Sequence, residues 1–339
     1  MVVVLKHAKR NSIIILLITI GFLYFLLKDK YVLIFNSLKD ANLLWIIVAI
    51  LVYVIYLFFD NLGLYVVTKI YKKDIKFKYI FKLGIMTKFF NGITPLASGG
   101  QPLQVLEMKK RGIKYTNGTS IVAESYILFQ IVLVSFALVS ILLNQIFHIF
   151  TKIKILKDLT IAGFMLNLML LLALLYISFS KKAAKKIIRG FINFLYKIKI
   201  VKDKDETKRR WDARCENYHK NAIDLYNDKK VIAYGLLCYL LSLIFFHAIP
   251  FFIMLALGVK DINIIKVIIA SCYAFIMSCY IPIPGATGGA ELCFLGIMAN
   301  FINEPVLTTT LIIWRFVTYY LPTVVGAIVF NIKKDRQHK

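Results

Sequence analysis

Two charged side chains inside apolar segments are the residues of this sequence best suited to bind a polar or charged group. Glu124 lies about 15 Å from Lys114, and Arg315 about 15 Å from Pro305, if each segment is a helix rising about 1.5 Å per residue. A lone charge at the centre of a bilayer costs at least roughly 2.5–3.5 kcal/mol, so each needs a partner or a polar cavity. We expect the two either to pair with each other, as a functional or purely structural ion pair, or to line a path for a polar headgroup. In the second case Arg315 would meet a phosphate, whose geometry suits a guanidinium.

Two motifs rich in glycine and proline could also bind an anion. Pro95–Gly100 and Pro284–Gly289 both fit P-x-A-[S/T]-G-G, at an offset of 189 residues. Helices that begin after such loops present free N–H groups to anions, and paired glycines allow a headgroup to approach closely. Glu291 either caps its helix or binds a cationic headgroup. The alternative is that the glycines only allow tight helix packing.

The candidate substrate-binding residues combine these motifs with the two buried charges. They are Pro95, Ser98, Gly99, Gly100, Gln101, Glu124, Pro284, Thr287, Gly288, Gly289, Glu291 and Arg315. No nucleophile–base arrangement is recognisable, so we predict no catalytic residue. We also expect no metal and no cofactor.

Composition places these residues in a membrane rather than in a soluble globule. Of the 339 residues 59% are hydrophobic, and the mean hydropathy is +0.72. The net charge of +25 is typical of loops that face anionic lipid, and no nucleic-acid partner is expected. The five cysteines have no paired or metal-binding spacing and are interpreted as small buried residues.

Six apolar runs approach or exceed the roughly 20 residues that cross a bilayer. They are 12–27, 43–68, 119–143, 159–179, 231–257 and 306–332. Two further apolar stretches, 80–106 and 264–302, are interrupted by the proline and glycine motifs. A broken backbone at membrane depth persists only where protein or a polar cavity satisfies it, so we predict two re-entrant hairpins.

The basic residues predict the orientation of these elements. Lysines flank the 80–106 hairpin on both sides, whereas the flanks of the 264–302 hairpin carry little charge. By the positive-inside rule, the first hairpin enters from the cytoplasm and the second from the opposite face. The basic segment 181–230 and both termini are expected to be cytoplasmic. We therefore expect a multi-pass protein of the plasma membrane.

These patterns together predict an inverted repeat. Residues 43–143 and 231–332 each comprise a span, a hairpin and a span, in opposite orientations. The predicted fold is a single all-α polytopic membrane domain, 1–339, of about six spans and two opposed hairpins. Such repeats place a binding site at their interface, near the middle of the bilayer.

Four other features have two interpretations each. Asp60 lies either within its span or at the interface, and His247 either relays protons or is a hydrogen-bonded core residue. Apolar residues between Ile187 and Ile198 recur at helical spacing in a basic context, which predicts an amphipathic helix on an anionic leaflet. A second short helix is expected between Trp211 and Leu225. The alternative for both helices is a solvated basic connector.

The two loops and the basic central segment resemble a known family. The loop Pro95–Pro102, PLASGGQP, and the loop Pro282–Glu291, PIPGATGGAE, are similar to those of the lysylphosphatidylglycerol synthase transmembrane family. This family is the flippase-like membrane region of the multiple peptide resistance factor. The resemblance covers nearly the whole chain. It implies translocation of a phospholipid such as phosphatidylglycerol or its lysyl form, linked to resistance against cationic antimicrobial peptides.

The full-length members of that family also carry a soluble domain that transfers lysine from charged tRNA to phosphatidylglycerol. Few residues follow 332 here, so we expect this chain to lack that domain and not to synthesise the lipid by itself. The expected partner is an anionic or aminoacylated phospholipid, with a second copy or a separate synthase as further partners. The alternatives are a lysyltransferase-type membrane enzyme and a non-transporting partner of a synthase.

Overall fold

Helices make up all the regular structure in the described part of the chain. A computed structural model describes residues 31–150, 154–197, 203–279, 281, 283, 286 and 288–335. Five helices are long and apolar enough to cross a membrane. They are α4 (Leu43–Tyr71), α7 (Tyr115–Phe147), α8 (Lys154–Phe179), α11 (Lys229–Ala256) and a bent helix that joins α14 (Val306–Arg315) to α15 (Leu321–Asp335). Their positions match five of the six predicted spans; the sixth, 12–27, lies outside the described residues.

Polar side chains fix where several helices begin. The Asn42 side chain accepts a hydrogen bond from the Leu44 N–H at 3.0 Å, and Asp228 accepts one from the Val231 N–H at 3.2 Å. Each bond satisfies a donor that has no partner within its helix. α4 and α11, the first spans of the two predicted repeats, therefore both start beside a capping side chain. A short helix, α3 (Tyr31–Lys39), precedes α4.

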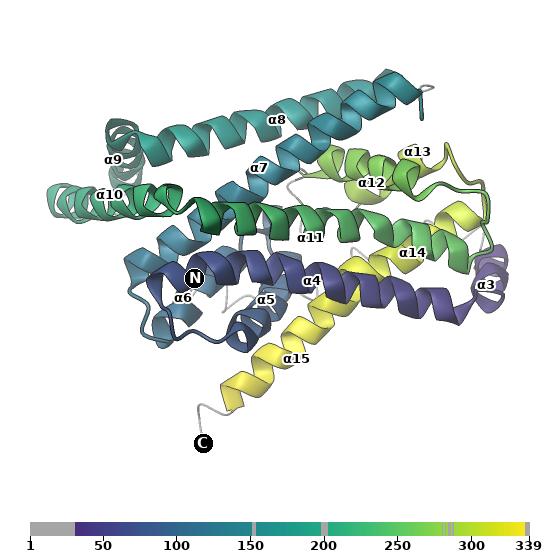
Figure 1. Cartoon of the computed structure of the whole chain (residues 1–339), viewed down its shortest axis with the longest axis horizontal. Helices are drawn as coiled ribbons and strands as arrows, with labels where there is room; N and C mark the ends of the chain where they lie inside the picture. The colour runs from purple at the N-terminus through teal and green to yellow at the C-terminus, as the bar shows by residue number, and fades with distance from the viewer. Residues whose placement is uncertain are drawn as a thin grey trace.

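α4 and α11 lie side by side in opposite directions along much of their length (Figure 1). The backbone N–H of Asn42 donates to the carbonyl of Ala256 at 2.8 Å, which joins the start of α4 to the end of α11. Farther along, a methyl group on Gly63 would come within 2.7 Å of the Tyr239 ring, so the glycine permits a close approach. The two halves of the chain are thus packed together along their first long helices.

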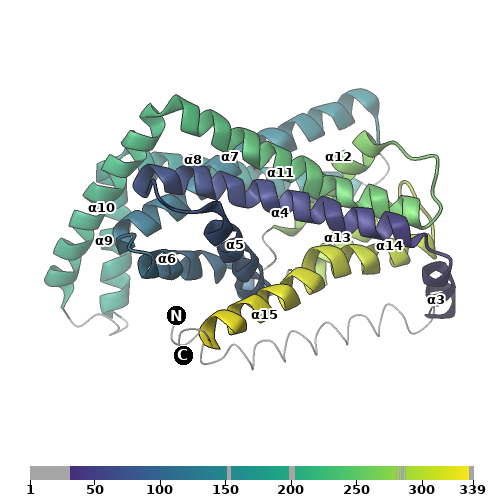
Figure 2. The ribbon, with the colours of Figure 1, turned by 60° about the horizontal axis from the view of Figure 1, so that its bottom comes forward.

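Two pairs of short helices lie toward opposite ends of the molecule (Figures 1 and 2). α5 (Phe77–Gly92) and α6 (Gly100–Lys110) are joined by a turn that includes a short 3-10 helix, Pro95–Ala97. α12 (Ile264–Ser278) and α13 (Gly289–Met298) form the other pair, near α3 and α14. Each predicted broken segment is therefore two short helices. The first pair shares its end of the molecule with α9 (Lys181–Lys197) and α10 (Lys204–Asn227).

The basic segment forms a hairpin of two helices, α9 and α10. Lys185 pairs with Glu216 at 2.7 Å, and Arg189 pairs with Asp212. The hydrogen bond from the Arg189 guanidinium holds the pKa of the Asp212 carboxyl below its ordinary value. The predicted amphipathic helix is present as α9, and it packs against α10 and the end of α8. The second helix is longer than predicted, because it begins near residue 204 at the capping side chain of Asp203.

The last long helix contains a π-helical turn, Phe316–Tyr320, between α14 and α15. Pro322 follows within one turn and has no N–H to continue the α-helical hydrogen bonds. A proline at this spacing is a recognised cause of a local change in helical winding. The π-turn begins immediately after Arg315, so it changes which side chains near this arginine share one face of the helix. Such turns are frequent at functional sites.

Candidate functional site

A cavity of about 420 Å³, here called the central cavity, lies between the turns of the two short-helix pairs. The first pair contributes Ala97 and Gln101 to its wall, and the second contributes Ala286 and Ala290. Among the described residues that line this cavity, Arg315 is the one that carries a charge. Its other polar lining residues are Tyr56, Asn91, Tyr126, Gln130, Asn167, Ser278, Thr318 and Tyr319. Both halves of the chain therefore enclose one polar space.

The two turns share an unusual backbone conformation at equivalent positions of the repeated motif. Ala97 has φ 51° and Ala286, at the offset of 189 residues, has φ 50°. Left-handed φ values cost energy at residues other than glycine and cluster at functional sites. The helices that follow also begin at equivalent residues, Gly100 for α6 and Gly289 for α13. The sequence repeat is thus a structural repeat at the cavity.

Arg315 is held at the cavity wall by Glu291. The distance from Arg315 Nε to Glu291 Oε1 is 2.8 Å, and both side chains are more than 90% buried. The guanidinium also lies 5.2 Å from the ring centre of Trp314 and 5.4 Å from that of Tyr319, which gives cation–π attraction. Glu291 comes from α13 and Arg315 from α14. The pair therefore joins the second short-helix pair to the last long helix.

The first turn satisfies several of its own backbone donors. The Gly99 N–H donates to Thr94 Oγ1, and the Gly100 N–H donates to Asn91 Oδ1, both at 2.9 Å. Pro95 and Ser98 are exposed and do not line the central cavity. Gln101 lines the cavity, and its side chain makes no hydrogen bond to the described residues.

The second turn is described only in part. Gly288 has φ 87°, a conformation that glycine adopts without strain, and Gly289 begins α13. Pro284 and Thr287, also predicted as site residues, lie outside the described residues. Of the predicted residues, Gln101 and Arg315 therefore line the cavity wall. Glu291 does not line it but pairs with Arg315.

The pairing of Glu124 with Arg315, one of the two arrangements predicted for these residues, is wrong, and Glu124 lines neither cavity that Arg315 or Asp60 borders. Glu124 is fully buried, and its two oxygens accept hydrogen bonds of 3.0 and 2.8 Å from the Tyr71 hydroxyl. Tyr71 is the last residue of α4, and its hydroxyl also lies 3.5 Å from the carbonyl of Asn221 in α10. Glu124 therefore lies toward the end of the molecule that carries the basic segment. The depth estimate failed because α7 is 33 residues long, so counting from its start does not locate the middle of the span.

A smaller chamber of about 200 Å³, the side chamber, adjoins the central cavity. The two spaces share lining residues, including Asn91, Gln101 and Tyr126. Lys88 and Asp60 lie in the wall of the side chamber, and Lys88 Nζ is 2.9 Å from Asp60 Oδ2. Asp60 is thus inside α4 and not at its end, and its depth in the membrane stays a prediction.

Sequence reasoning did not find Lys88. The available signal was one of the two lysines inside the broken apolar stretch 80–106, opposite in charge to Asp60 in the preceding span. It also missed Gln130 and Asn167, whose side chains join α7 to α8 at 2.8 Å beside the cavity. Gln130 and Asn167 are polar residues inside predicted spans, but nothing in the sequence showed that they meet.

His247 is a hydrogen-bonded core residue. It is fully buried in α11, its Nδ1 lies 3.0 Å from Ser271 Oγ, and its ring stacks on Phe136 with centres 5.5 Å apart. It lines neither the central cavity nor the side chamber. The structure therefore supports the core interpretation and not the proton relay.

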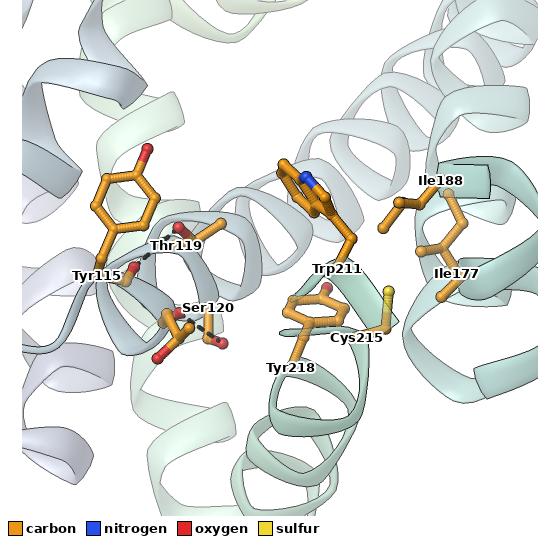
Figure 3. A pocket seen from close by; sticks show the side chains of 10 residues that line it. Tyr115, Thr119, Ser120, Ile177, Ile188, Trp211, Cys215 and Tyr218 are labelled. Atoms are coloured by element: carbon orange, nitrogen blue, oxygen red, sulfur yellow. Dashed lines mark hydrogen bonds between the residues drawn. The ribbon is translucent and has the colours of Figure 1, made fainter. Parts of the chain in front are cut away.

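Another pocket, also of about 200 Å³, lies where α7 begins, beside α8, α9 and α10 (Figure 3). Trp211, Cys215 and Tyr218 of α10 face Thr119 and Ser120 of α7 across it, and its lining is mostly apolar. Asn221 anchors α10 to this region by donating to Ser120 Oγ at 2.9 Å. None of the predicted site residues lines this pocket.

The long apolar helices, packed around a polar interior, define a multi-pass helical membrane protein. Residues 12–326 match the family described as the lysylphosphatidylglycerol synthase TM region, and the chain belongs to this family. It is also similar to a UPF0104 membrane protein of Archaeoglobus fulgidus. The two are 27% identical over 305 residues, which cover 87% of this chain and 88% of the relative.

Proposed function

We propose that this protein moves a phospholipid between the two leaflets of a membrane, with the central cavity as the binding site for the headgroup. The observation that carries the proposal is the position of Arg315, a buried cation in a polar cavity enclosed by two repeated short-helix turns. A guanidinium binds phosphate oxygens well. The cavity volume lies within the roughly 300–1,000 Å³ of small-molecule sites.

The proposed mechanism is alternating access. The short-helix pairs act as re-entrant hairpins from opposite faces, and each gates the cavity toward one leaflet. Basic end segments face the cytoplasm of a plasma membrane. The headgroup crosses through the polar interior while the acyl chains remain in the bilayer. Export of the lysyl form, which carries a net positive charge, is our explanation for the family's implied link to cationic peptide resistance.

Transport accounts for the site better than lysyl transfer. The two carboxylates nearest the cavities, Asp60 and Glu291, are both held in ion pairs. A general base would have to leave its cation before it could act.

The test is leaflet exchange of fluorescent phosphatidylglycerol in liposomes that contain the purified full chain. Gln101→Trp places a bulky ring where the central cavity and the side chamber meet, and we expect exchange to fall to the rate of empty liposomes. Leu142→Trp is the matched control, because Leu142 lies on the exposed face of α7. Wild-type protein that is folded but exchanges no faster than empty liposomes would refute transport.

A further inference from the structure

Glu124 is a buried carboxyl group whose partner is a hydroxyl and not a cation. The residue is fully buried, and its two oxygens lie 3.0 and 2.8 Å from the Tyr71 hydroxyl. Among the described residues, no lysine, arginine or histidine forms an ion pair with it. Asp60 and Glu291, the carboxylates beside the cavities, each have a cation. The hydroxyl gives Glu124 a hydrogen bond but leaves a negative charge there uncompensated.

The groups that face Glu124 include another carboxyl and two further phenols. Asp224 of α10 is the charged group that acts on it electrostatically, and it has the same sign. Tyr218 and Tyr226 of α10 lie in the same range, and the Tyr226 hydroxyl is buried without a hydrogen-bond partner in the described chain. The helices α4, α6, α8, α11 and α12 also pack against α7, and none brings a described charged group close to Glu124. These surroundings favour a neutral carboxyl group over a carboxylate.

The contacts of the Tyr71 hydroxyl cannot all be made with one hydrogen. Its oxygen lies near three acceptors, which are the two Glu124 oxygens and the Asn221 carbonyl at 3.5 Å. A hydroxyl has one hydrogen to donate. When Glu124 carries a proton, its own O–H donates to Tyr71 Oη, and the Tyr71 hydrogen turns to the Asn221 carbonyl. One added proton thus completes a chain of hydrogen bonds that links α7, α4 and α10.

The element at the end of this chain is the α9–α10 hairpin, which hydrogen bonds hold against α7 and α8. Asn221 donates to Ser120 Oγ at 2.9 Å, and the hydroxyls of Tyr218 and Ser178 lie 2.8 Å apart. His219 Nδ1 lies 2.9 Å from the Ser178 carbonyl oxygen. Each such bond contributes little net stability, because water replaces it when the hairpin leaves. A buried charge that appears beside these bonds therefore outweighs several of them.

We propose that Glu124 is a proton-binding site that controls the docking of the α9–α10 hairpin on the long apolar helices. With its proton, Glu124 completes the chain to Asn221, and the hairpin stays docked. Without it, a negative charge remains buried beside Asp224, and the hairpin moves away so that water reaches the carboxylate. The pocket of Figure 3 gives the proton a path, because its lining includes Tyr218 and also Ser120, one helical turn before Glu124. This inference does not depend on lipid transport.

The test is amide hydrogen exchange along α10 in the purified full chain, compared between wild type and Glu124→Gln at each pH. Glutamine keeps the shape and the donor of a protonated carboxyl group but cannot ionise. Comparison at equal pH cancels the intrinsic pH dependence of exchange. Buried carboxyl groups in proteins are known to titrate as high as about pH 8–9, so the range runs from about pH 6 to about pH 10.

We expect α10 to be equally protected in both proteins near about pH 6. Near about pH 10, we expect exchange at least roughly tenfold faster in wild type, because only wild type then carries the buried charge. Equal protection over the whole range would overturn the proposal. A difference already present at the lowest pH would also overturn it, since Glu124 would then be ionised in the docked state.

Two further variants assign the effect to the chain of hydrogen bonds. Asp224→Asn is the matched control, because it removes the exposed neighbouring carboxyl group, and it should keep the pH-dependent loss of protection. Loss of that dependence would make Asp224 the titrating group and overturn the assignment. Tyr71→Phe removes the central hydroxyl, and we expect faster α10 exchange even at the lowest pH. Unchanged protection in folded Tyr71→Phe would contradict the chain.

Two other comparisons use wild type alone. Protection that follows sodium in place of choline, and not pH, would identify a metal cation at Glu124 and overturn the proton. If Glu124→Gln does not fold, the wild-type exchange of α10 relative to α11 at each pH decides the proposal. None of these measurements uses leaflet exchange, so failure of the proposed transport would leave this inference standing, and its own failure would leave transport standing.

Discussion

At the scale of single residues, the central observation is that Arg315 and Glu124 each have a partner other than the other. Arg315 pairs with Glu291, and Glu124 accepts its hydrogen bonds from Tyr71. Both arrangements satisfy the requirement that a buried charge has a partner. The sequence showed that these residues need partners, because each lies in an apolar segment. It did not show which partner, because that depends on how the helices pack.

The Arg315–Glu291 pair gives a prediction about stability. Arg315→Met leaves the Glu291 carboxylate buried without its cation, and we expect a loss of about 3–5 kcal/mol in the free energy of unfolding. Adding Glu291→Gln should recover most of this loss while lipid exchange stays low. Denaturant unfolding and liposome exchange on the same preparations measure both.

An exposed pair provides the control for this prediction. Arg189→Ala removes the ion pair with Asp212 on the α9–α10 hairpin, where the Arg189 side chain is 51% exposed. The expected loss is much smaller than for Arg315→Met, because water screens such pairs. If Arg315→Met cost no more than Arg189→Ala, the buried pair would not be a structural element of the site.

At the scale of elements, the two turns are the parts that the sequence repeat anticipated best. The motif P-x-A-[S/T]-G-G predicted a break in each apolar stretch, and each stretch is two short helices. The equivalent alanines, Ala97 and Ala286, share a left-handed φ, and the equivalent glycines, Gly100 and Gly289, begin the following helices. Local backbone preference explains this success, since proline and glycine restrict or permit conformations whatever the surroundings.

The close packing of the first turn gives a second prediction. A methyl group on Gly100 would lie 2.2 Å from Asn91 Oδ1 and 2.4 Å from Thr87 Cγ2. We expect Gly100→Ala to lower the free energy of unfolding by about 1–3 kcal/mol and to slow lipid exchange, because the turn must shift. Thermal unfolding and exchange assays measure the two effects.

Gly190→Ala is the matched control, because no atom lies within 4 Å of the added methyl on α9. In a helix interior this change should stabilise by up to about 1 kcal/mol. Equal behaviour of the two variants would show that the Gly100 turn tolerates a side chain and is not tightly packed.

At the scale of the whole molecule, the two short-helix pairs lie toward opposite ends of the helical bundle (Figure 2). The basic residues flank α5–α6 and also fill α9–α10, whereas α12–α13 lies at the end with few charges. This arrangement agrees with the inverted orientation that the charge pattern predicts. The membrane faces themselves remain a prediction of the positive-inside rule.

Labelling of introduced cysteines tests this orientation. Lys109 at the end of α6 and Ala299 after α13 are both exposed. We expect an impermeant thiol reagent to modify Lys109→Cys only from the cytoplasmic face and Ala299→Cys only from the opposite face of oriented vesicles. Wild-type protein measures the background from the five native cysteines. Labelling of both positions from one face would contradict the inverted topology.

The sequence by itself determined the class of the protein, the positions of its described spans, the two broken segments and the need to neutralise buried charges. These depend on composition, hydropathy and local backbone preference, which act over a few residues. The tertiary structure alone decided that Lys88 meets Asp60, that Glu291 and not Glu124 holds Arg315, and that the π-turn after Arg315 borders a cavity shared by both halves. Those contacts join helices far apart in the chain. Helix register and close packing at small residues such as Gly63 select them, and neither leaves a periodic signal in the sequence.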